Sequence, residues 1–193
     1  MPIRNRRAAA LPAKLSRSWL LINAAKEEDF APGLASEADS VIFDLEASVP
    51  DDQKASARAS VMEALNGGMT AWVRISPTSS EHWEDDVAAL SKADGLRGVM
   101  LAETERPDQV TYTAMRLKAG TPVIALVESA LGVENATQIA NAPAPSVCLR
   151  HQRFPQGRGR LRRSHGPGLR PLPAGHRLPC GRAARGDRRP HPC

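Results

Sequence analysis

The chain has 193 residues, of which 41% are apolar, and carries a formal net charge of +5. This length suffices for one sizeable hydrophobic core, and no apolar stretch is long enough to span a bilayer. The average charge conceals two unlike segments. Residues 1–145 hold 14 Lys and Arg against 20 Asp and Glu, whereas residues 146–193 hold 12 Arg and a single acid. We therefore place a boundary near residue 144.

The N-terminal segment, residues 1–16, contains four basic side chains and no acid. Because it lacks the apolar core of a secretory signal, we predict a disordered leader or a misplaced start codon, with a transit peptide as an alternative. All three cysteines lie beyond residue 144. This distribution argues against a disulfide scaffold and is compatible with a reducing, cytoplasmic location.

Short apolar runs alternate with helical patterns along the acidic part of the chain. The predicted strands are residues 19–22, 41–43, 71–75, 99–101 and 122–127, and the predicted helices are residues 26–38, 51–65, 81–92, 107–118 and 133–141. Asp51 is a suitable N-cap for the second helix. Spacings of about 20 to 30 residues between strand-helix pairs predict parallel strands with right-handed crossovers. The predicted fold class is α/β, in a domain of residues 17–143.

Charged residues follow the predicted strands at their C-terminal ends. They are Asp44 and Glu46 after the second strand, Arg74 near the end of the third, Glu103 after the fourth and Glu128 after the fifth. In open α/β sheets and in (β/α) barrels, side chains at these ends face one shared crevice. The sequence therefore predicts that these polar groups are neighbours in space.

Several short motifs carry a resemblance to a known family. They are Arg17-Ser18, DLEASV at residues 44–49, Lys54 with Ala57-Arg58, VRIS at residues 73–76 and LVESALGV at residues 126–133. In this order they resemble the HpcH/HpaI aldolase and citrate lyase β-subunit family, which includes CoA-ester lyases of the malyl-CoA lyase type. The resemblance implies a (β/α)8 TIM barrel, of which about five β/α units are present, assembled as a trimer or hexamer. It also implies Mg²⁺-dependent cleavage or formation of the bond β to a thioester carbonyl.

The resemblance also implies roles for site residues. Glu128 matches the Mg²⁺-binding glutamate, which also contacts the substrate, and a hard cation prefers oxygen ligands. Arg74 matches the substrate-binding arginine, whose planar guanidinium suits a carboxylate. Asp44 and Glu46 match an acidic catalytic motif that holds metal-bound waters or orients Arg74. The alternatives are that Glu128 is a solvated residue at a helix start, that Arg74 only pairs with these acids, and that the acids are plain loop charges.

The chain departs from the family pattern at three places. A second Asp is usual where Ala47 stands, Pro-Lys where Ala102-Glu103 stands, and Val-Pro-Gly where Ile22-Asn23-Ala24 stands. Glu103 thus reverses a charge at the mouth of the crevice. This reversal can weaken the binding of an anionic substrate or of the CoA phosphates.

The C-terminal segment, residues 144–193, reads as a low-complexity tail that is rich in Arg, Pro and Gly. Without apolar periodicity it cannot offset its ordering entropy, so we predict disorder. The family's next motif, Phe-Gly with a metal-binding Asp three residues after the Gly, is absent. One back-translation of residues 148–158, shifted by one base, yields Ala-Phe-Gly-Ile-Asn-Asp, which fits that motif. We infer a frameshift, which would leave the barrel incomplete and the second metal carboxylate missing.

The function predicted from the resemblance is cleavage of a 3-hydroxyacyl-CoA, of the malyl or citramalyl type, into an acyl-CoA and a 2-oxo acid. The rival is a non-catalytic α/β fragment that binds other subunits, or polyanions through its arginines. Nucleic-acid binding has little support, because Phe154 is the single aromatic residue of the tail. Zinc binding by Cys148 with His151, or by His176 with Cys180, lacks paired ligand spacing.

Overall fold

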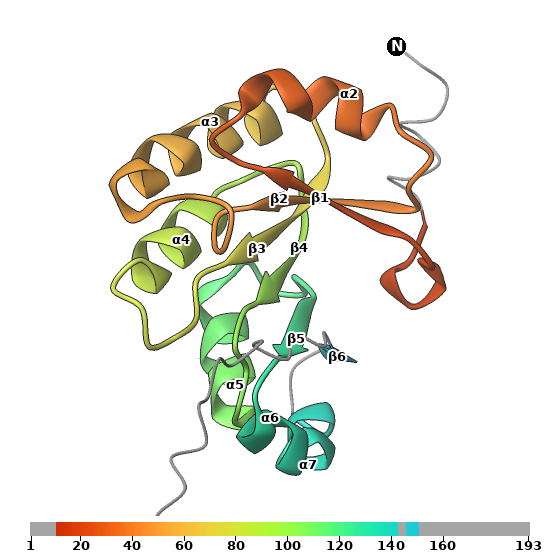
Figure 1. Ribbon diagram of the computed structural model, residues 1–193, viewed down its shortest axis with the longest axis vertical. Coiled ribbons are helices and arrows are strands. Elements are labelled where there is room, and N and C mark those ends of the chain that lie inside the picture. Colours follow the sequence, from red (N-terminus) through yellow and green to blue (C-terminus); the bar gives the residue numbers. More distant parts are fainter. Residues whose placement is uncertain (1–10, 143–145, 151–193) are drawn as a thin grey trace, which may run out of the picture. The chain divides into compact units, whose positions relative to one another are not determined.

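The structure is a computed structural model that describes residues 11–142 and the backbone of residues 146–150. The described residues fall within one compact unit, residues 1–155. They form a six-stranded sheet in the order β1-β2-β3-β4-β5-β6, in which every neighbouring pair is parallel (Figure 1). The strands are β1 (Trp19–Asn23), β2 (Ser40–Asp44), β3 (Ala71–Ile75), β4 (Leu96–Leu101), β5 (Val123–Val127) and β6 (Ser146–Arg150).

Helices connect the successive strands. They are α2 (Phe30–Leu34), α3 (Lys54–Asn66), α4 (Trp83–Leu90), α5 (Pro107–Arg116), α6 (Ala130–Glu134) and α7 (Ala136–Ala140), with 3-10 turns η1 (Ala13–Leu15), η2 (Glu27–Asp29) and η3 (Asp51–Gln53). Helices α3, α4 and α5 pack in sequence along one face of the sheet (Figure 1). A strand order that never reverses, with its helices on one face, is the arrangement of (β/α) barrels rather than of doubly wound sheets. The predicted α/β fold class is confirmed.

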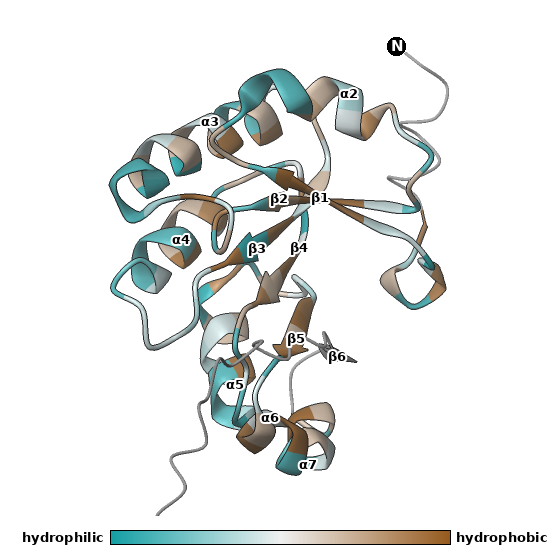
Figure 2. Ribbon diagram, in the orientation of Figure 1, coloured by the Kyte–Doolittle hydropathy of each residue, from teal (hydrophilic) through white to brown (hydrophobic). Residues whose placement is uncertain are grey.

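The strands are apolar on both faces, which explains their continuous hydrophobic runs. The larger core lies between the sheet and the helices and contains, for example, Phe43 of β2, Val73 of β3 and Val87 of α4. The other face carries a smaller cluster: Ile42, Trp72, Met100, Ile124 and Leu126, with Ala13 and Trp19 packed against it. Figure 2 shows the hydrophobic strands and the hydrophilic outer faces of the helices.

The five predicted strands are confirmed, but parts of three helices differ from the prediction. The helix predicted over residues 26–38 is reduced to η2 and α2. The helix predicted over residues 133–141 is two short helices separated at Asn135. Asp51 is not an N-cap, since Pro50 precedes η3 and Gln53 precedes α3. Instead, its carboxylate lies 4.0 Å from the Lys54 ammonium.

The predicted leader and tail each overlap described residues. In the leader, residues 13–15 form η1, and the guanidinium of Arg97 donates to the carbonyl of Leu11 at 2.6 Å. In the tail, residues 146–150 form β6, which pairs with β5. Residues 1–10, 143–145 and 151–193 lie outside the described residues. They include His151, His176 and Cys180 of the zinc alternatives and most of the predicted frameshift, whereas Cys148 lies in β6, where only the backbone is described. No helix in the described part of the chain has the length and apolarity to cross a membrane.

Candidate active site

The ends of β2 and β3 bring a carboxylate and a guanidinium together. Asp44 is the last residue of β2, and its register partner on β3 is Arg74. Register partners on adjacent parallel strands project to the same face of a sheet. Because position 44 is on the same face as Ile42, and Arg74 on the same face as Trp72, both side chains belong to the face turned away from the helices.

Arg74 and Asp44 form a bidentate ion pair that is almost completely buried. The Nε and Nη2 atoms of Arg74 each donate to one Asp44 carboxylate oxygen at 2.7 Å, and the residues are only 4% and 2% exposed. The Nη1 atom of Arg74 lies 3.3 Å from an Oε2 oxygen of Glu46. The ion pairs that the sequence offered as an alternative to substrate binding by Arg74 are thus present, and its role toward a substrate stays a prediction. Of the five N–H groups of a guanidinium, these contacts engage three, and the other two have no partner among the described residues.

The carboxylate of Asp44 also organises the loop that follows β2. Its oxygens accept the backbone N–H groups of Glu46 at 3.0 Å and Ser48 at 3.2 Å. Burial raises the pKa of Asp44, but the hydrogen bonds from Arg74 and Ser48 outweigh it and hold the pKa below its ordinary value. For Arg74 the signs are reversed. Burial lowers its pKa, but the carboxylates of Asp44, Glu46 and Glu128 more than compensate, so the pKa of Arg74 is raised. The pair therefore stays charged.

Glu46 has the opposite electrostatic character. Burial is the largest cause that raises its pKa, and Arg74 only partly offsets this effect. The carboxylates of Asp44, Glu128 and Glu103 raise the pKa of Glu46 further. These groups interact because they share one crevice, as the sequence predicts. The pKa of Glu46 is thus held above its ordinary value.

The ends of β4 and β5 carry Glu103 and Glu128. Glu103 is exposed and has a left-handed backbone, with a φ of 47°. Its N–H donates to the Oε2 oxygen of the half-buried Glu128 at 3.4 Å, which is a long contact. The neighbouring backbone is firmly held, because Ser129 accepts the N–H of Gly132 at 3.1 Å and donates to Glu105 at 2.7 Å. The backbone at Glu128 is therefore fixed, and the described residues give its carboxylate one hydrogen bond, the long contact from Glu103.

The crevice fits a hard divalent cation in its chemistry. Asp44, Glu46, Glu103 and Glu128 bring four carboxylates near the guanidinium of Arg74. Among the described residues, no three His, Cys, Asp or Glu side chains are grouped as a ready-made metal cluster. Magnesium commonly takes one or two carboxylates and completes its shell with water and substrate oxygens. Glu128 has a carboxylate available for such a role.

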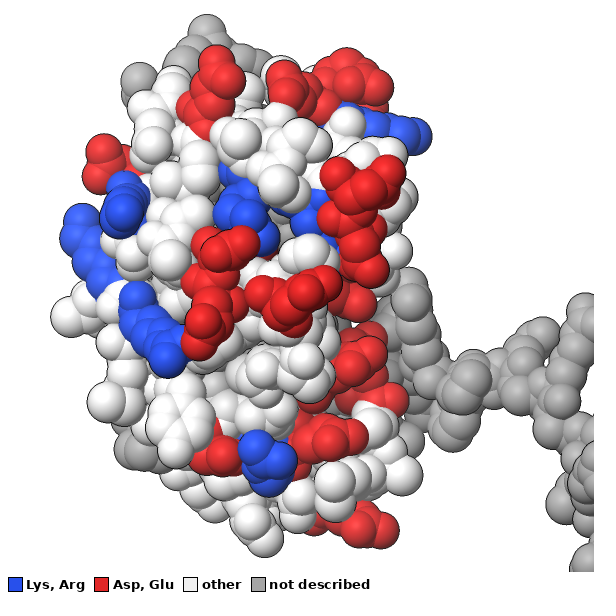
Figure 3. All heavy atoms as spheres, turned by 90° about the vertical axis from the view of Figure 1, so that its left-hand side faces the viewer, with Lys and Arg blue, Asp and Glu red and all other residues white. Residues whose placement is uncertain are grey.

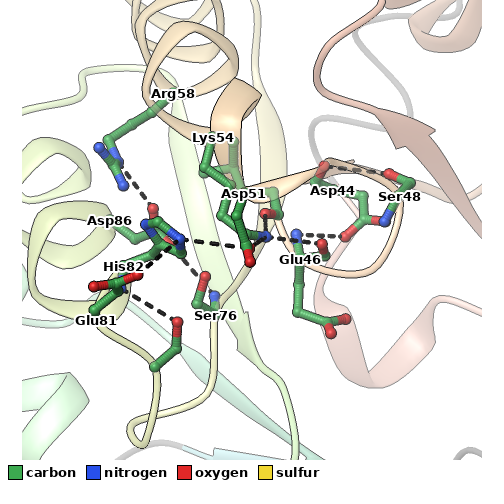
Figure 4. A network of polar contacts seen from close by, with 12 residues as sticks. Asp44, Glu46, Ser48, Asp51, Lys54, Arg58, Ser76, Glu81, His82 and Asp86 are labelled. Carbon is green, nitrogen blue, oxygen red and sulfur yellow. Dashed lines mark hydrogen bonds and ion pairs between the residues drawn. The ribbon is translucent and has the colours of Figure 1, made fainter.

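A network behind the crevice connects α3 to the ends of β2 and β3 (Figure 4). The Lys54 ammonium donates to the carbonyls of Leu45 at 2.9 Å and Glu46 at 3.0 Å. Arg58 donates to the buried carboxylate of Asp86, which accepts the N–H of Ser76. Sequence reasoning identified Lys54 and Arg58 only as family matches and gave them no role. It missed Asp86, which no sequence signal separates from its acidic neighbours.

The fold and the crevice define the class of this protein: an α/β protein of barrel type whose polar site lies at the carboxyl ends of parallel strands. The model of the HpcH/HpaI aldolase/citrate lyase family matches residues 17–150. The chain belongs to this family.

Curated relatives share part of their length with this chain. A (3S)-malyl-CoA thioesterase of Cereibacter sphaeroides is 35% identical over 133 residues, which cover 66% of this chain and 45% of the relative. The citrate lyase subunit beta of Leuconostoc mesenteroides is 37% identical over 119 residues, covering 54% and 39%. The chain thus spans about half the length of the curated relatives it matches.

Solved structures agree with this assignment. The citrate lyase beta subunit of Mycobacterium tuberculosis, in complex with oxaloacetate and magnesium, aligns with a TM-score of 0.60 at 33% identity. That alignment covers 75% of this chain and 60% of the other. CitE from the same organism, in complex with magnesium, acetoacetate and coenzyme A, aligns with a TM-score of 0.59 at 34% identity, covering 71% and 49%.

Proposed function

We propose that this chain carries part of the site of a Mg²⁺-dependent carbon-carbon lyase. Its substrate is a 3-hydroxyacyl-CoA of the malyl or citramalyl type, and its products are an acyl-CoA and a 2-oxo acid. The observation that carries this proposal is the buried Arg74, which Asp44 and Glu46 hold in place. It lies close enough to Glu128 for that carboxylate to raise the pKa of Arg74. A carboxylate-binding group and a metal-binding group side by side suit a 2-oxo acid.

Glu128 is the residue proposed to hold the metal. Its half-buried carboxylate accepts a long contact from the N–H of Glu103, and the described residues leave its other lone pairs available. When bound, Mg²⁺ supplies positive charge that stabilises the negative charge developing as the carbon-carbon bond breaks. The acidic surroundings of the crevice favour cation binding, and they oppose an anionic substrate until the cation is present.

Arg74 is the residue proposed to bind the carboxylate of the oxo acid. Its two remaining N–H groups can donate to that carboxylate, while Asp44 keeps the guanidinium in a fixed orientation. Glu46 steadies the third side of the guanidinium and can accept hydrogen bonds from waters in the crevice. A fixed guanidinium loses little freedom when the ligand binds, which improves affinity.

Calorimetric titration of the full chain with oxaloacetate tests this proposal. We expect binding in the presence of MgCl2 and its loss when the metal is chelated with EDTA. Arg74→Lys should weaken binding by about tenfold or more, because an ammonium cannot replace the planar, bidentate donor. Binding that is absent with the metal, or equal with and without it, would refute the proposed function.

Turnover of malyl-CoA gives a second readout. Formation of the 2-oxo acid reports the lyase reaction, and release of free thiol reports thioester hydrolysis, the activity named for one relative. We expect slow turnover, because the Asp of the family's Phe-Gly motif is absent from this sequence. Turnover as fast as that of a complete lyase would contradict the predicted loss of the second metal carboxylate. A trimeric or hexameric assembly remains a prediction that light scattering can test.

A further inference from the structure

Helix α3 directs two basic side chains, Lys54 and Arg58, toward the segments that follow β2 and β3. Lys54 is its first residue, and Arg58 lies four residues later, so both side chains extend from one face of the helix. Their side chains are only 8% and 12% exposed. Buried cations of this kind are costly unless the surrounding groups satisfy them. Their contacts therefore indicate what they do.

Lys54 holds the exit of β2. Its ammonium donates to two successive backbone carbonyls, those of Leu45 at 2.9 Å and Glu46 at 3.0 Å. The N–H groups at this point are also occupied, since Leu45 donates to the carbonyl of Arg74 and Glu46 donates to the Asp44 carboxylate. The peptide that carries the Glu46 side chain is thereby fixed from both sides.

Arg58 holds the exit of β3 through one intermediary. Its Nε donates at 2.9 Å to Asp86, whose other oxygen accepts the N–H of Ser76 at 3.1 Å. Ser76 follows Arg74 by two residues. Figure 4 shows Lys54 and Arg58 reaching from α3 toward the loop of Glu46 and toward Asp86 beside Ser76. The same helix face thus fixes the backbone on either side of the contact between Glu46 and Arg74.

We propose that Lys54 is a positioning residue, which keeps the Glu46 carboxylate beside Arg74 by holding the backbone carbonyls of the loop. Arg58 supports it from the β3 side. Neither side chain touches the substrate. The carbonyl contacts require a donor with more than one N–H at the end of a long, straight stem, which lysine supplies and an apolar residue of equal length does not. This inference deepens the proposed function, but the first part of its test does not depend on it.

The first part of the test follows the crevice by NMR in the full chain with Lys54→Met. Two signals are read: the Glu46 carboxyl carbon as a function of pH, and the Nε–H of Arg74. If Lys54 positions the loop, releasing it exposes Glu46 to water, so the pKa of Glu46 falls toward its ordinary value. We also expect exchange of the Arg74 Nε–H with water to accelerate by about tenfold or more, since the guanidinium is then less well held.

Two other outcomes would overturn the proposal. If Lys54 acts only through its charge, removing that charge raises the pKa of Glu46 further, because a nearby cation is lost. If Lys54 only stabilises the fold, the melting temperature falls while both signals stay unchanged. Lys118→Met serves as the matched control, because Lys118 is exposed, and it should alter neither signal.

Lys54→Arg keeps the test decisive if the methionine variant does not fold. A guanidinium retains several donors, so we expect it to restore the Glu46 and Arg74 signals at least half-way to those of the wild type. A well-folded Lys54→Arg protein with no restoration, in which the pKa of Glu46 lies at its ordinary value and the Arg74 Nε–H exchanges about tenfold faster than in the wild type, would contradict the proposal.

The second part of the test measures affinity for oxaloacetate in the presence of MgCl2. We expect Lys54→Met to weaken binding about tenfold and Lys118→Met to leave it unchanged. If the wild type itself does not bind oxaloacetate, the proposed function fails, and the NMR signals still decide the positioning role. If the wild type binds and Lys54→Met binds equally well, the positioning role fails while the proposed function stands.

Discussion

The two halves of the crevice are built in different ways. At the ends of β2 and β3, the carboxylate of Asp44 accepts four hydrogen bonds, two from Arg74 and two from backbone N–H groups. At the ends of β4 and β5, the carboxylate of Glu128 accepts one N–H at 3.4 Å from the described part of the chain, and Glu103 is exposed. Among the described residues, the first half is therefore satisfied within the protein, whereas the second half retains unused oxygen acceptors.

This difference separates residues that hold the site from residues that can bind a ligand. A carboxylate with all its acceptors filled contributes to stability and orientation, and it has little left to offer a cation. A half-buried carboxylate with free lone pairs on a fixed backbone can instead bind a cation without first breaking hydrogen bonds within the protein. Asp44 therefore belongs to the scaffold and Glu128 to the binding surface, although both follow strands in the same manner.

The largest expected effect comes from breaking the satisfied half. Asp44→Asn leaves the buried guanidinium of Arg74 without its bidentate partner, and removal of one member of such a pair costs about 3 kcal/mol of unfolding free energy. Urea unfolding monitored by circular dichroism measures this loss. Asp85→Asn is the control, because Asp85 pairs with Arg58 at the surface and is 72% exposed. We expect the control to change the free energy by less than about 0.5 kcal/mol. Equal losses would contradict the comparison.

The pH dependence of unfolding sharpens the same point. The pKa of Asp44 is lower in the folded protein than its ordinary value of 3.8, so its contribution is fully present above that pH. It is lost as the pH falls through the folded pKa, because the unfolded chain then binds the proton more readily. The stability difference between wild type and Asp44→Asn should therefore shrink below about pH 4. A constant difference from pH 7 to pH 3 would show that the charge of Asp44 is unimportant.

Glu46 should respond with the opposite sign. Its pKa is higher in the folded protein than its ordinary value of 4.5, so its ionised form is disfavoured by folding. The folded state is favoured while Glu46 is protonated, and this advantage is lost as the pH rises through the folded pKa. Glu46→Gln should therefore raise the unfolding free energy at pH 7, by less than about 1 kcal/mol, and have no effect near pH 3. A destabilised variant at pH 7 would disprove this assignment.

The smallest expected effect concerns the backbone of the open half. Glu103 adopts a φ of 47°, which glycine accepts at no steric cost. Glu103→Gly should stabilise the protein by about 0.5 kcal/mol, since the relieved strain slightly exceeds the added chain entropy. Glu81→Gly is the control: the side chain is 87% exposed and the backbone has a negative φ, so a small loss is expected. Thermal unfolding of both variants checks the sign.

Sequence predicted the strands and the shared crevice because both depend on local patterns. Continuous apolar runs identify strands buried on two faces, and the parallel topology then places Arg74, Glu46 and Glu128 at one edge. Local patterns did not predict the bidentate pairing in detail, because register between strands 30 residues apart is a tertiary property. The roles of Lys54 and Asp86 were not predicted for a related reason. Lys54 donates to backbone carbonyls, which leave no mark on the sequence, and Asp86 contacts the N–H of Ser76 and the side chain of Arg58, 28 residues away.

The helix ends were predicted less well where short-range signals competed. Asp51 is a good N-cap by residue type, yet the turn η3 begins at Asp51 itself and α3 begins only at Lys54. Lys54, the first residue of α3, directs its side chain to the carbonyls of Leu45 and Glu46. On the face shown in Figure 3, acidic and basic side chains are interspersed. Their distribution does not indicate where a helix begins or ends.

The most direct test of the account replaces Mg²⁺ by paramagnetic Mn²⁺ in the presence of oxaloacetate and measures the broadening of backbone amide signals. We predict that the amides of Glu103 and Glu128 broaden first, and that Glu128→Gln abolishes this broadening while changing the unfolding free energy by less than about 0.5 kcal/mol. Strongest broadening at the surface acids of α4, or broadening that persists in Glu128→Gln, would contradict the division of the crevice into a scaffold half and a binding half.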